Sequence, residues 1–366
     1  MTVVHRWLAE PLPAAVANAL ERLAEAPGVH HVAVMPDVHL AEHVCVGTVV
    51  GTDELVYPQA VGGDIGCGML VLRLDATSDA LDTEQAAARL FAELRARVPA
   101  VRQPKRCDCD VELSDEGLQR RALRDMQVEL GTLGRGNHFL EVQADDQEQL
   151  WLMVHSGSRA LGPMVRDHHL ARGERVGKGL VAMQADGAGR AYLRDHDAAI
   201  AFARANRRAI AEATAAALRE ALDVDVAWDS WRDVLHNFVR REEHGEATLW
   251  VHRKGASSAR AGEFGAIPGS MGSWSFHVEG RGHPQALASS SHGAGRRLPR
   301  GEAMRRITVR DLERDLGSVF FERELAARLR DEAPAAYKDI GAVMRAQRDL
   351  VRVVRRLRPV LAYKGA

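Results

Sequence analysis

The sequence predicts a mixed α/β or α+β fold in which central β-sheets are flanked by helices, in a single domain spanning residues 1–366. Strand-like runs dominate the middle of the chain, and helical patterns lie on either side of them. No repeat, linker or low-complexity tract divides the sequence. With 46% hydrophobic residues, 366 residues can bury a large core.

The first third of the chain begins with a predicted helix, residues 11–26, which ends at Pro27-Gly28. A β-rich run, 29–35, is expected to stop at Pro36, so that Asp37 lies just past a strand end, where loops tend to carry function. Further strands are predicted at 44–50 and 70–74, and a helix at 79–97.

The rest of the chain alternates between the two patterns. Residues 100–118 are polar and irregular, whereas 190–222 is a long Ala-rich helical pattern. Strands are predicted at 139–142, 150–154, 247–251 and 275–278, and two helices, 309–330 and 338–357, close the chain.

Composition narrows the class of protein. The 49 Lys and Arg nearly balance the 50 Asp and Glu, which argues against a general nucleic-acid coat protein. The last 66 residues carry a mild net charge of +5, which indicates at most a phosphate-facing region. The four cysteines form no disulfide framework, and neither a signal peptide nor an apolar run of ~18 residues is present. We therefore expect a soluble, cytoplasmic protein that does not associate with membranes.

The glycine-rich stretch 61–69 is the chemical centre of the sequence. Asp64 and Cys67 stand three residues apart where four of nine positions are glycine. Glycine lets the backbone approach an ion closely, so both side chains could point at one metal ion. Taken alone, the pattern is more typical of a tight turn with a buried thiol.

Three histidines could return to this stretch. His138 lies between glycines and a strand, with Asn137 before it and Glu141 after it; His155 ends a predicted strand; and His236 follows an apolar run. Each could equally be a structural hydrogen-bonding residue. Together with Asp64 and Cys67 they suffice for two metal ions that share the thiolate, an arrangement that suits phosphoryl or nucleotidyl transfer. The ligand types leave zinc and manganese open.

Further loops could bind phosphate or carry a nucleophile. His292 lies between serines and small residues, so its ring is sterically open to act as a covalent nucleophile or a base, and Arg296 follows it. A flexible solvated loop is the alternative. Ser270 lies in a turn that could contact a ligand, and Lys364 would ordinarily be a frayed terminal residue.

The motifs, taken together and in order, resemble the RtcB family of RNA-splicing ligases. The resemblance runs from about residue 30 to the end and rests on Met35-Pro36-Asp37-Val38-His39, Asp64-Ile65-Gly66-Cys67-Gly68-Met69, Gly131-Thr132-Leu133-Gly134 with Asn137-His138-Phe139, His155-Ser156-Gly157-Ser158-Arg159, Arg253-Lys254-Gly255-Ala256, Pro268-Gly269-Ser270-Met271-Gly272, Ser291-His292-Gly293-Ala294-Gly295-Arg296, Ala336-Tyr337-Lys338-Asp339-Ile340 and Lys364-Gly365.

The resemblance implies a ligase that joins an RNA 2′,3′-cyclic phosphate or 3′-phosphate end to a 5′-hydroxyl end, using GTP and two Mn²⁺ ions. His292 would form a histidine–GMP intermediate, with Asp37 orienting it and Arg296 assisting, and the guanylate would pass to the RNA 3′-phosphate. The implied metal ligands are Asp64, Cys67, His138, His155 and His236. The implied nucleotide contacts are Asn137 on a phosphate, Glu141, Ser270, Tyr337 and Lys364 around guanine, and Met271, Gly293, Ala294 and Gly295.

The sequence departs from the family pattern beside the expected active site. Leu40-Ala41-Glu42-His43 replaces Leu-Gly-Lys-Gly, and Pro299-Arg300 replaces a Ser-Arg pair. We therefore expect a competent but divergent enzyme for tRNA splicing or RNA repair, with repair favoured by these departures. We expect it to act as a monomer, with an accessory activating protein as a further partner. The alternatives are a metal-dependent cyclic-phosphate hydrolase that does not ligate and a non-catalytic RNA- or nucleotide-binding protein.

Overall fold

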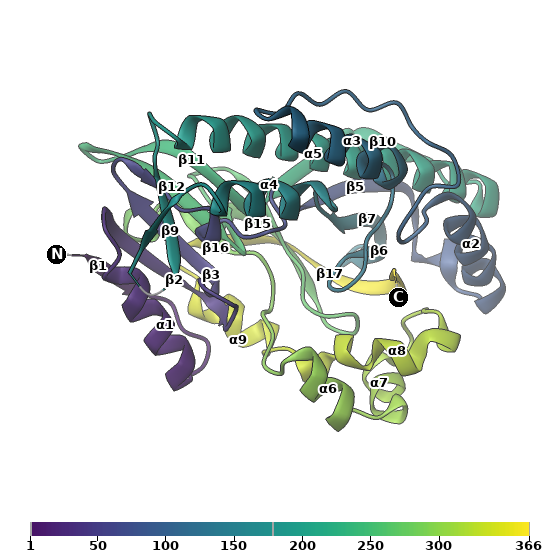
Figure 1. The fold of residues 1–366 in the computed structure, drawn as a ribbon. Helices are drawn as coiled ribbons and strands as arrows, with labels where there is room; N and C mark the ends of the chain where they lie inside the picture. Colours follow the sequence, from purple (N-terminus) through teal and green to yellow (C-terminus); the bar gives the residue numbers. More distant parts are fainter. Residues whose placement is uncertain (1, 178, 366) are drawn as a thin grey trace.

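The computed structural model describes residues 2–177 and 179–365, and it confirms the predicted mixed α/β class (Figure 1). Helices surround two large sheets. Their bounds are α1 (Ala14–Ala24), α2 (Glu84–Arg97), α3 (Glu116–Glu129), α4 (Leu161–Leu170), α5 (Gly189–Leu222), α6 (Arg300–Arg306), α7 (Val309–Leu316), α8 (Ala326–Leu329) and α9 (Ile340–Ala346).

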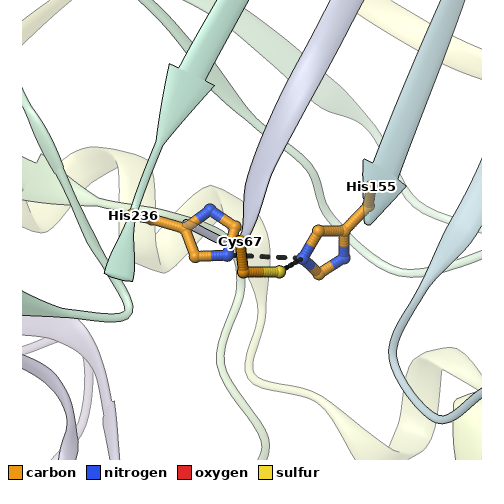
Figure 2. A group of neighbouring side chains, drawn as sticks. All are labelled: Cys67, His155 and His236. Atoms are coloured by element: carbon orange, nitrogen blue, oxygen red, sulfur yellow. Dashed lines mark hydrogen bonds between the residues drawn. The ribbon is translucent and has the colours of Figure 1, made fainter. Parts of the chain in front are cut away.

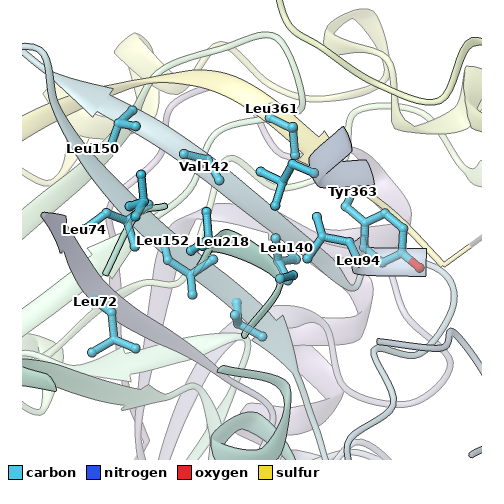
Figure 3. Packing of buried hydrophobic residues seen from close by; sticks show 14 of the residues in the cluster. Leu72, Leu74, Leu94, Leu140, Val142, Leu150, Leu152, Leu218, Leu361 and Tyr363 are labelled. Carbon is cyan, nitrogen blue, oxygen red and sulfur yellow. The ribbon is translucent and has the colours of Figure 1, made fainter. Parts of the chain in front are cut away.

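The larger sheet has seven strands, and all neighbouring pairs in it are antiparallel. Its spatial order is β10 (Val226–Leu235), β5 (Gly68–Thr77), β7 (Gln149–Ser156), β6 (Phe139–Asp145), β17 (Val351–Tyr363), β15 (Ser275–Gly280) and β14 (Phe264–Ile267). Leucines of β5, β6 and β7 pack against Leu94 of α2 and Leu218 of α5, which builds the main core on this face (Figure 3).

The second sheet has five strands, β1 (Val3–Arg6), β2 (Val29–His39), β3 (Val46–Thr52), β12 (Ala247–Lys254) and β11 (Asn237–His244), in that spatial order. Only β1 and β2 run parallel to each other among these pairs. Smaller sheets pair β13 (Ala256–Ser258) with β16 (Ser289–Ser291), and join β4 (Leu55–Val56), β9 (Leu180–Gln184) and β8 (Glu174–Val176).

The predicted end of the strand at Pro36 is wrong, because β2 continues to His39. The pairing of β2 with β3 is irregular between Val34 and His39. Proline lacks a backbone donor, and such a break in the ladder is where a strand tolerates it. Asp37 therefore projects from a strand and not from a loop.

The predicted C-terminal helix 338–357 is also wrong. The helix α9 is short, and residues 351–363 form β17, which pairs with β6 on one side and β15 on the other. The expected helix 309–330 is divided, since α7 ends at Leu316 and is followed by Gly317, whose φ is +57°. The helices α3 and α4 and the strands β10 and β11 were not predicted.

Other expectations are confirmed. The long helix at 190–222 is α5, and the predicted strands near 44, 70, 139, 150, 247 and 275 are all present. In the described residues, no helix is long and apolar enough to cross a membrane.

Candidate active site

A cavity of about 380 Å³ lies where the edges of the two large sheets meet. Residues from distant parts of the chain line it. They include fifteen of the residues that the sequence points to: Asp64, Cys67, Asn137, Glu141, His155, His236, Ser270, Met271, His292, Gly293, Ala294, Gly295, Arg296, Tyr337 and Lys364. The other two, Asp37 and His138, contact this lining from behind.

Strand register explains why three of the side chains meet. Gly68, at the start of β5, pairs with Ser156 at the end of β7 and with Leu235 at the end of β10. The residues just beside these pairs, Cys67, His155 and His236, are therefore brought to one edge of the sheet. Phe139 pairs with His155, which places His138 at the same edge.

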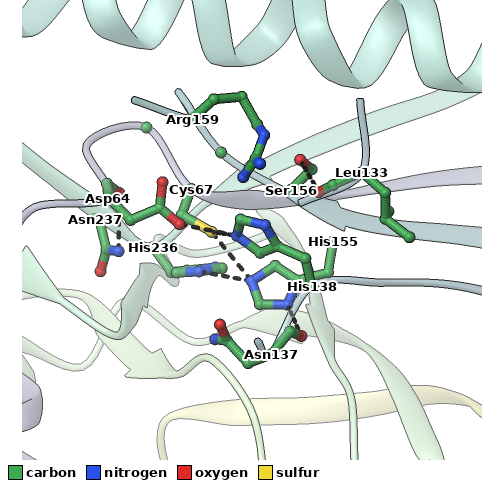
Figure 4. Close-up of polar contacts among 12 residues, drawn as sticks. Asp64, Cys67, Leu133, Asn137, His138, His155, Ser156, Arg159, His236 and Asn237 are labelled. Atoms are coloured by element: carbon green, nitrogen blue, oxygen red, sulfur yellow. Dashed lines mark hydrogen bonds and ion pairs between the residues drawn. The ribbon is translucent and has the colours of Figure 1, made fainter. Parts of the chain in front are cut away.

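Cys67 belongs to two groups of metal-ligand atoms. The Cys67 Sγ lies 3.1 Å from His155 Nε2, which lies 3.3 Å from His236 Nε2 (Figure 2). The same Sγ lies 3.5 Å from His138 Nε2, which lies 2.9 Å from Asp64 Oδ2 (Figure 4). Two three-ligand groups thus share one sulfur, as the sequence had suggested for a pair of metal ions.

Burial sets the protonation of these ligands. It lowers the pKa of both His155 and His236 well below the usual value, so both imidazoles are neutral and their lone pairs are available at neutral pH. Burial opposes ionisation of Asp64, but the His138 imidazole outweighs it and the pKa falls to about 2. Burial and Asp64 raise the pKa of the Cys67 thiol well above its usual range, so a thiolate there needs a bound cation. The donor set fits divalent cations of the first transition row.

The Asp37 carboxylate holds His292 in one orientation. Asp37 Oδ2 accepts from His292 Nδ1 at 2.7 Å and from the His292 backbone N–H at 3.3 Å. This bond places the proton on Nδ1 and leaves a lone pair on Nε2. The His292 ring lies beside the His236 ring, with centroids 4.7 Å apart, so the free nitrogen is next to the metal-ligand groups.

Two further contacts fix the Asp37 segment. The Lys338 ammonium donates to the carbonyl oxygens of Pro36 at 3.0 Å and Val38 at 2.5 Å, so it clamps the backbone on both sides of Asp37. Gly295 has a φ of +74°, and a Cβ there would clash with the Asp37 carbonyl oxygen. Only glycine allows the His292 loop to approach so closely.

The opposite end of the cavity contains buried acidic and basic side chains. Burial raises the pKa of Glu141 to about 7, and its carboxylate accepts from Gln143 Nε2 at 2.7 Å. The Lys364 ammonium is buried, so the terminal lysine is ordered, and it forms an ion pair with Glu332. Tyr337 also donates to Glu332, at 2.8 Å.

Glu332 is the main residue that the sequence failed to indicate. It is buried and accepts from Lys364, Tyr337, Arg296 and Arg300. Burial alone would raise its pKa, but Lys364 and Arg300 hold that pKa down at about 2. Nothing in the local sequence separates it from other charged residues of 322–332.

Arg296 has its guanidinium occupied by the surrounding chain. It donates to Leu298 O at 3.1 Å, Asp331 O at 2.6 Å, Glu332 at 3.3 Å and the Tyr337 hydroxyl at 3.1 Å. These bonds make Arg296 a support for the wall of the cavity. Lys254, which the sequence placed in a motif without a role, lines the cavity, and burial lowers its pKa to about 8.

The arrangement offers a nucleophilic nitrogen, two groups of metal ligands and a pocket of paired charges within one cavity. A phosphate ester held by cations at Cys67 would lie next to His292 Nε2. A planar polar group could be recognised between Glu141 and Lys364, because an ionised carboxylate accepts from N–H donors on its edge and an ammonium donates to its acceptors.

Comparisons with known proteins agree with this geometry. A family model described as tRNA-splicing ligase RtcB matches residues 19–116 and 109–365. The chain is 37% identical to the RNA-splicing ligase RtcB of Escherichia coli K12, an alignment that covers 97% of this chain and 95% of that protein. It is 33% identical to an RNA-splicing ligase RtcB2 of another E. coli strain, over 95% of this chain and 91% of that protein. It is 30% identical to the RNA-splicing ligase RtcB of Mycobacterium tuberculosis, over 94% of this chain and 99% of that protein. This chain therefore belongs to the RtcB family.

Proposed function

We propose that the protein is a GTP- and Mn²⁺-dependent RNA ligase that joins 3′-phosphate or 2′,3′-cyclic phosphate ends to 5′-hydroxyl ends. One observation carries the proposal: His292 presents a free Nε2 in the cavity, fixed by Asp37 at 2.7 Å and beside two metal-ligand groups that share Cys67. Family membership supports the same activity.

The metal ligands would be Asp64, Cys67, His138, His155 and His236, which form the two groups. When bound there, Mn²⁺ would neutralise phosphate charge and stabilise the charge that develops during phosphoryl transfer. The carboxylate Asp64 suits manganese, whereas the thiolate and imidazoles would also accept zinc, so the ion used is part of the proposal.

The pocket between Glu141 and Lys364 would hold guanine. Guanine carries two N–H donors and one carbonyl acceptor on its Watson–Crick edge, which match an ionised Glu141 and the Lys364 ammonium. Ser270 and Tyr337 line the same pocket. The loop of Met271 and the small residues Gly293, Ala294 and Gly295 would lie along the nucleotide, and Asn137 would hold a phosphate.

The proposed chemistry has three balanced steps. His292 Nε2 attacks the α-phosphorus of GTP; a P–N bond forms, the bond to the bridging oxygen breaks and pyrophosphate leaves. Asp37 stabilises the positive charge that develops on the imidazole. An oxygen of the RNA 3′-phosphate then attacks the guanylate phosphorus and releases His292. Finally the 5′-hydroxyl attacks the RNA 3′-phosphorus, the phosphodiester forms and GMP leaves. A cyclic phosphate needs hydrolysis to a 3′-phosphate first.

We further propose that the chain acts as one catalytic domain and as a monomer, in tRNA splicing or RNA repair, and that an accessory protein can activate it. The changed segment 40–43 motivates the repair role. This segment follows β2 along the chain. Its Leu40 side chain is exposed, and Glu42 Oε1 lies 3.7 Å from His43 Nε2. Glu42 also contributes to the electrostatic environment of Lys254.

The test is transfer of label from α-labelled GTP in the presence of Mn²⁺. We expect acid-labile labelling of the wild type and none of His292→Ala. His283→Ala is the matched control, since His283 lies outside the cavity lining and its variant should label normally. Absence of label on the wild type would reject the ligase.

A broken RNA with a cyclic-phosphate end separates ligation from hydrolysis. We expect a joined product with GTP and only an opened 3′-phosphate without it. Opened but unjoined RNA in the presence of GTP would instead support the hydrolase alternative, and binding without either reaction would support a non-catalytic protein.

A further inference from the structure

A second large groove lies between α3 and α4, outside the catalytic cavity. Its volume is about 1070 Å³. Residues of α3 and α4 line it, and side chains of both helices share a buried cluster with α5. The three helices lie on the same side of the molecule (Figure 1). The groove is lined by Asp115, Gly117, Arg120, Arg121, Arg124, Pro163, Met164, Asp167, His168, Ala171 and Arg172.

The free charges of this groove are positive. Arg121 and Arg124 are exposed, and neither has an ion-pair partner within residues 2–177 and 179–365. Both acidic side chains of the lining are already engaged. Asp115 caps α3 by accepting from Leu118 N at 2.8 Å, and Asp167 accepts from Arg166 at 2.7 Å. The groove therefore presents unpaired guanidinium groups to solvent.

The walls also offer apolar surface. Pro163, Met164 and Ala171 line the groove together with the arginines of α3 and Arg172. Guanidinium groups bind phosphates, and neighbouring apolar and planar groups contact sugars and bases. This combination fits a nucleic-acid strand better than a small anion, which needs no long groove.

Helix α4 connects the groove to the catalytic cavity. Its first turn packs closely on the glycine-rich stretch 61–69, which carries Asp64 and Cys67. The approach is so close that a Cβ on Gly162 would clash with the Gly63 carbonyl oxygen. Arg166 lies against Gly63, which lines the cavity, and pairs with Asp167, which lines the groove. From Gly162 to Asp167 the helix rises only about 8 Å, so a strand that leaves the cavity past Gly63 would meet the lining of the groove at Asp167 within that distance.

We propose that the α3–α4 groove binds the phosphodiester backbone of the RNA that flanks the ends being joined. This inference rests on the proposed ligase function. The flanking RNA belongs either to the 3′-phosphate strand or to the 5′-hydroxyl strand; both present the same backbone, and testing each strand separately identifies which one enters the groove.

The test compares RNA binding by wild type and by the triple variant Arg120→Gln, Arg121→Gln and Arg124→Gln. The probes are single strands of about 5 and about 25 nucleotides, with either a 3′-phosphate or a 5′-hydroxyl end. We expect the variant to bind one of the long strands about tenfold more weakly at 150 mM salt. The slope of the logarithm of its binding constant against the logarithm of the salt concentration should become shallower by about 2, because three phosphate contacts are lost. Binding of the short strands is expected to stay unchanged.

The matched control removes the same charge elsewhere, with Arg89→Gln, Arg310→Gln and Arg328→Gln, three exposed arginines on α2, α7 and α8. It should bind both lengths as the wild type does. Equal weakening by the two triple variants, or long strands bound normally by the groove variant, would overturn the inference. Labelling with α-labelled GTP should be normal in both variants, so failure of the ligase function itself is recognised independently.

Discussion

At the scale of single residues, Glu332 connects four side chains at the proposed base pocket. Its two oxygens accept from Lys364 and Tyr337, and from Arg296 and Arg300. Lys364 is thereby held in a buried position where it can recognise a base carbonyl. If the pocket holds guanine as proposed, its recognition would depend on a carboxylate that need not contact the base itself.

We predict that Glu332→Gln raises the KM for GTP in self-guanylylation about tenfold, because one charge-assisted contact is worth about 1.5 kcal/mol or more. Discrimination against ATP should fall as well, as Lys364 is no longer fixed. Asp195→Asn is the control: it also neutralises a buried carboxylate, one that binds His169 and Ser114 away from the cavity. It should lower the melting temperature while leaving the KM unchanged.

Glu141 should make GTP binding depend on pH. Its pKa is raised to about 7 by burial, and only the ionised carboxylate accepts from both guanine N–H groups. GTP affinity, measured by calorimetry, is therefore expected to rise between pH 6 and pH 8. The raised pKa also affects folding, because the folded chain binds the Glu141 proton more tightly than the unfolded chain does. The free energy of unfolding therefore falls as the pH rises from about 4.5 to 7.

The variant Glu141→Gln removes this titration and should bind GTP weakly with a flat profile over the same range. It should also remove the loss of stability toward high pH. A wild-type affinity that falls as pH rises would contradict the assignment.

At the scale of elements, α5 positions the loops that carry the proposed metal ligands. Arg207 is fully buried and donates to Gly66 O and Ser156 O, both at 2.8 Å, while pairing with Asp233 at 2.6 Å. One side chain thereby ties the loop of Asp64 and Cys67 to the strand end of His155. The neighbouring Asn206 donates to Ser156 Oγ at 3.0 Å and reinforces this link.

We predict that Arg207→Met lowers the free energy of unfolding by about 2–5 kcal/mol, because it leaves the carbonyl oxygens of Gly66 and Ser156 without their buried donor. Asp233 keeps an ion pair with Arg204 at 3.2 Å. Metal affinity should fall together with the stability. The control is Arg208→Met, next along the helix, whose exposed side chain pairs with Glu212. It should change the unfolding free energy by no more than about 0.5–1 kcal/mol in urea titrations.

The proposed metal ions should stabilise the whole molecule. The metal ligands come from four separate strand ends and loops, so only the folded chain assembles them. At a free Mn²⁺ concentration of about 100 times the Kd, one site contributes about 2.7 kcal/mol to the unfolding free energy. Because the Cys67 thiol must lose its proton, affinity should increase with pH.

The corresponding measurement is the metal content by elemental analysis, together with the melting temperature before and after chelation. We expect Cys67→Ala to lose most of its metal and its response to the chelator, since the sulfur belongs to both groups. Cys45→Ala, another buried thiol outside the cavity lining, should retain both properties.

Much of the fold follows from local pattern. The 34 residues of α5 could be predicted because an Ala-rich amphipathic run is helical by itself. Strand β17 was mistaken for a helix, since its Arg and Leu residues also suit a helix, and its state is decided by pairing with β6 and β15. The helix α3 could not be predicted, because it follows a polar, irregular stretch and no clear change of pattern indicates where the helix begins.

The sequence by itself determined the family and indicated the candidate residues of the site, because their chemistry and order along the chain resemble that family. Only the tertiary structure decided which atoms meet. The register of β5 with β7 and β10 brings Cys67 to His155 and His236, and a carboxylate without any motif, Glu332, becomes the partner of the terminal Lys364. The physical reason is that side-chain chemistry is local, whereas strand pairing and the burial of charge are set by residues far apart in the chain.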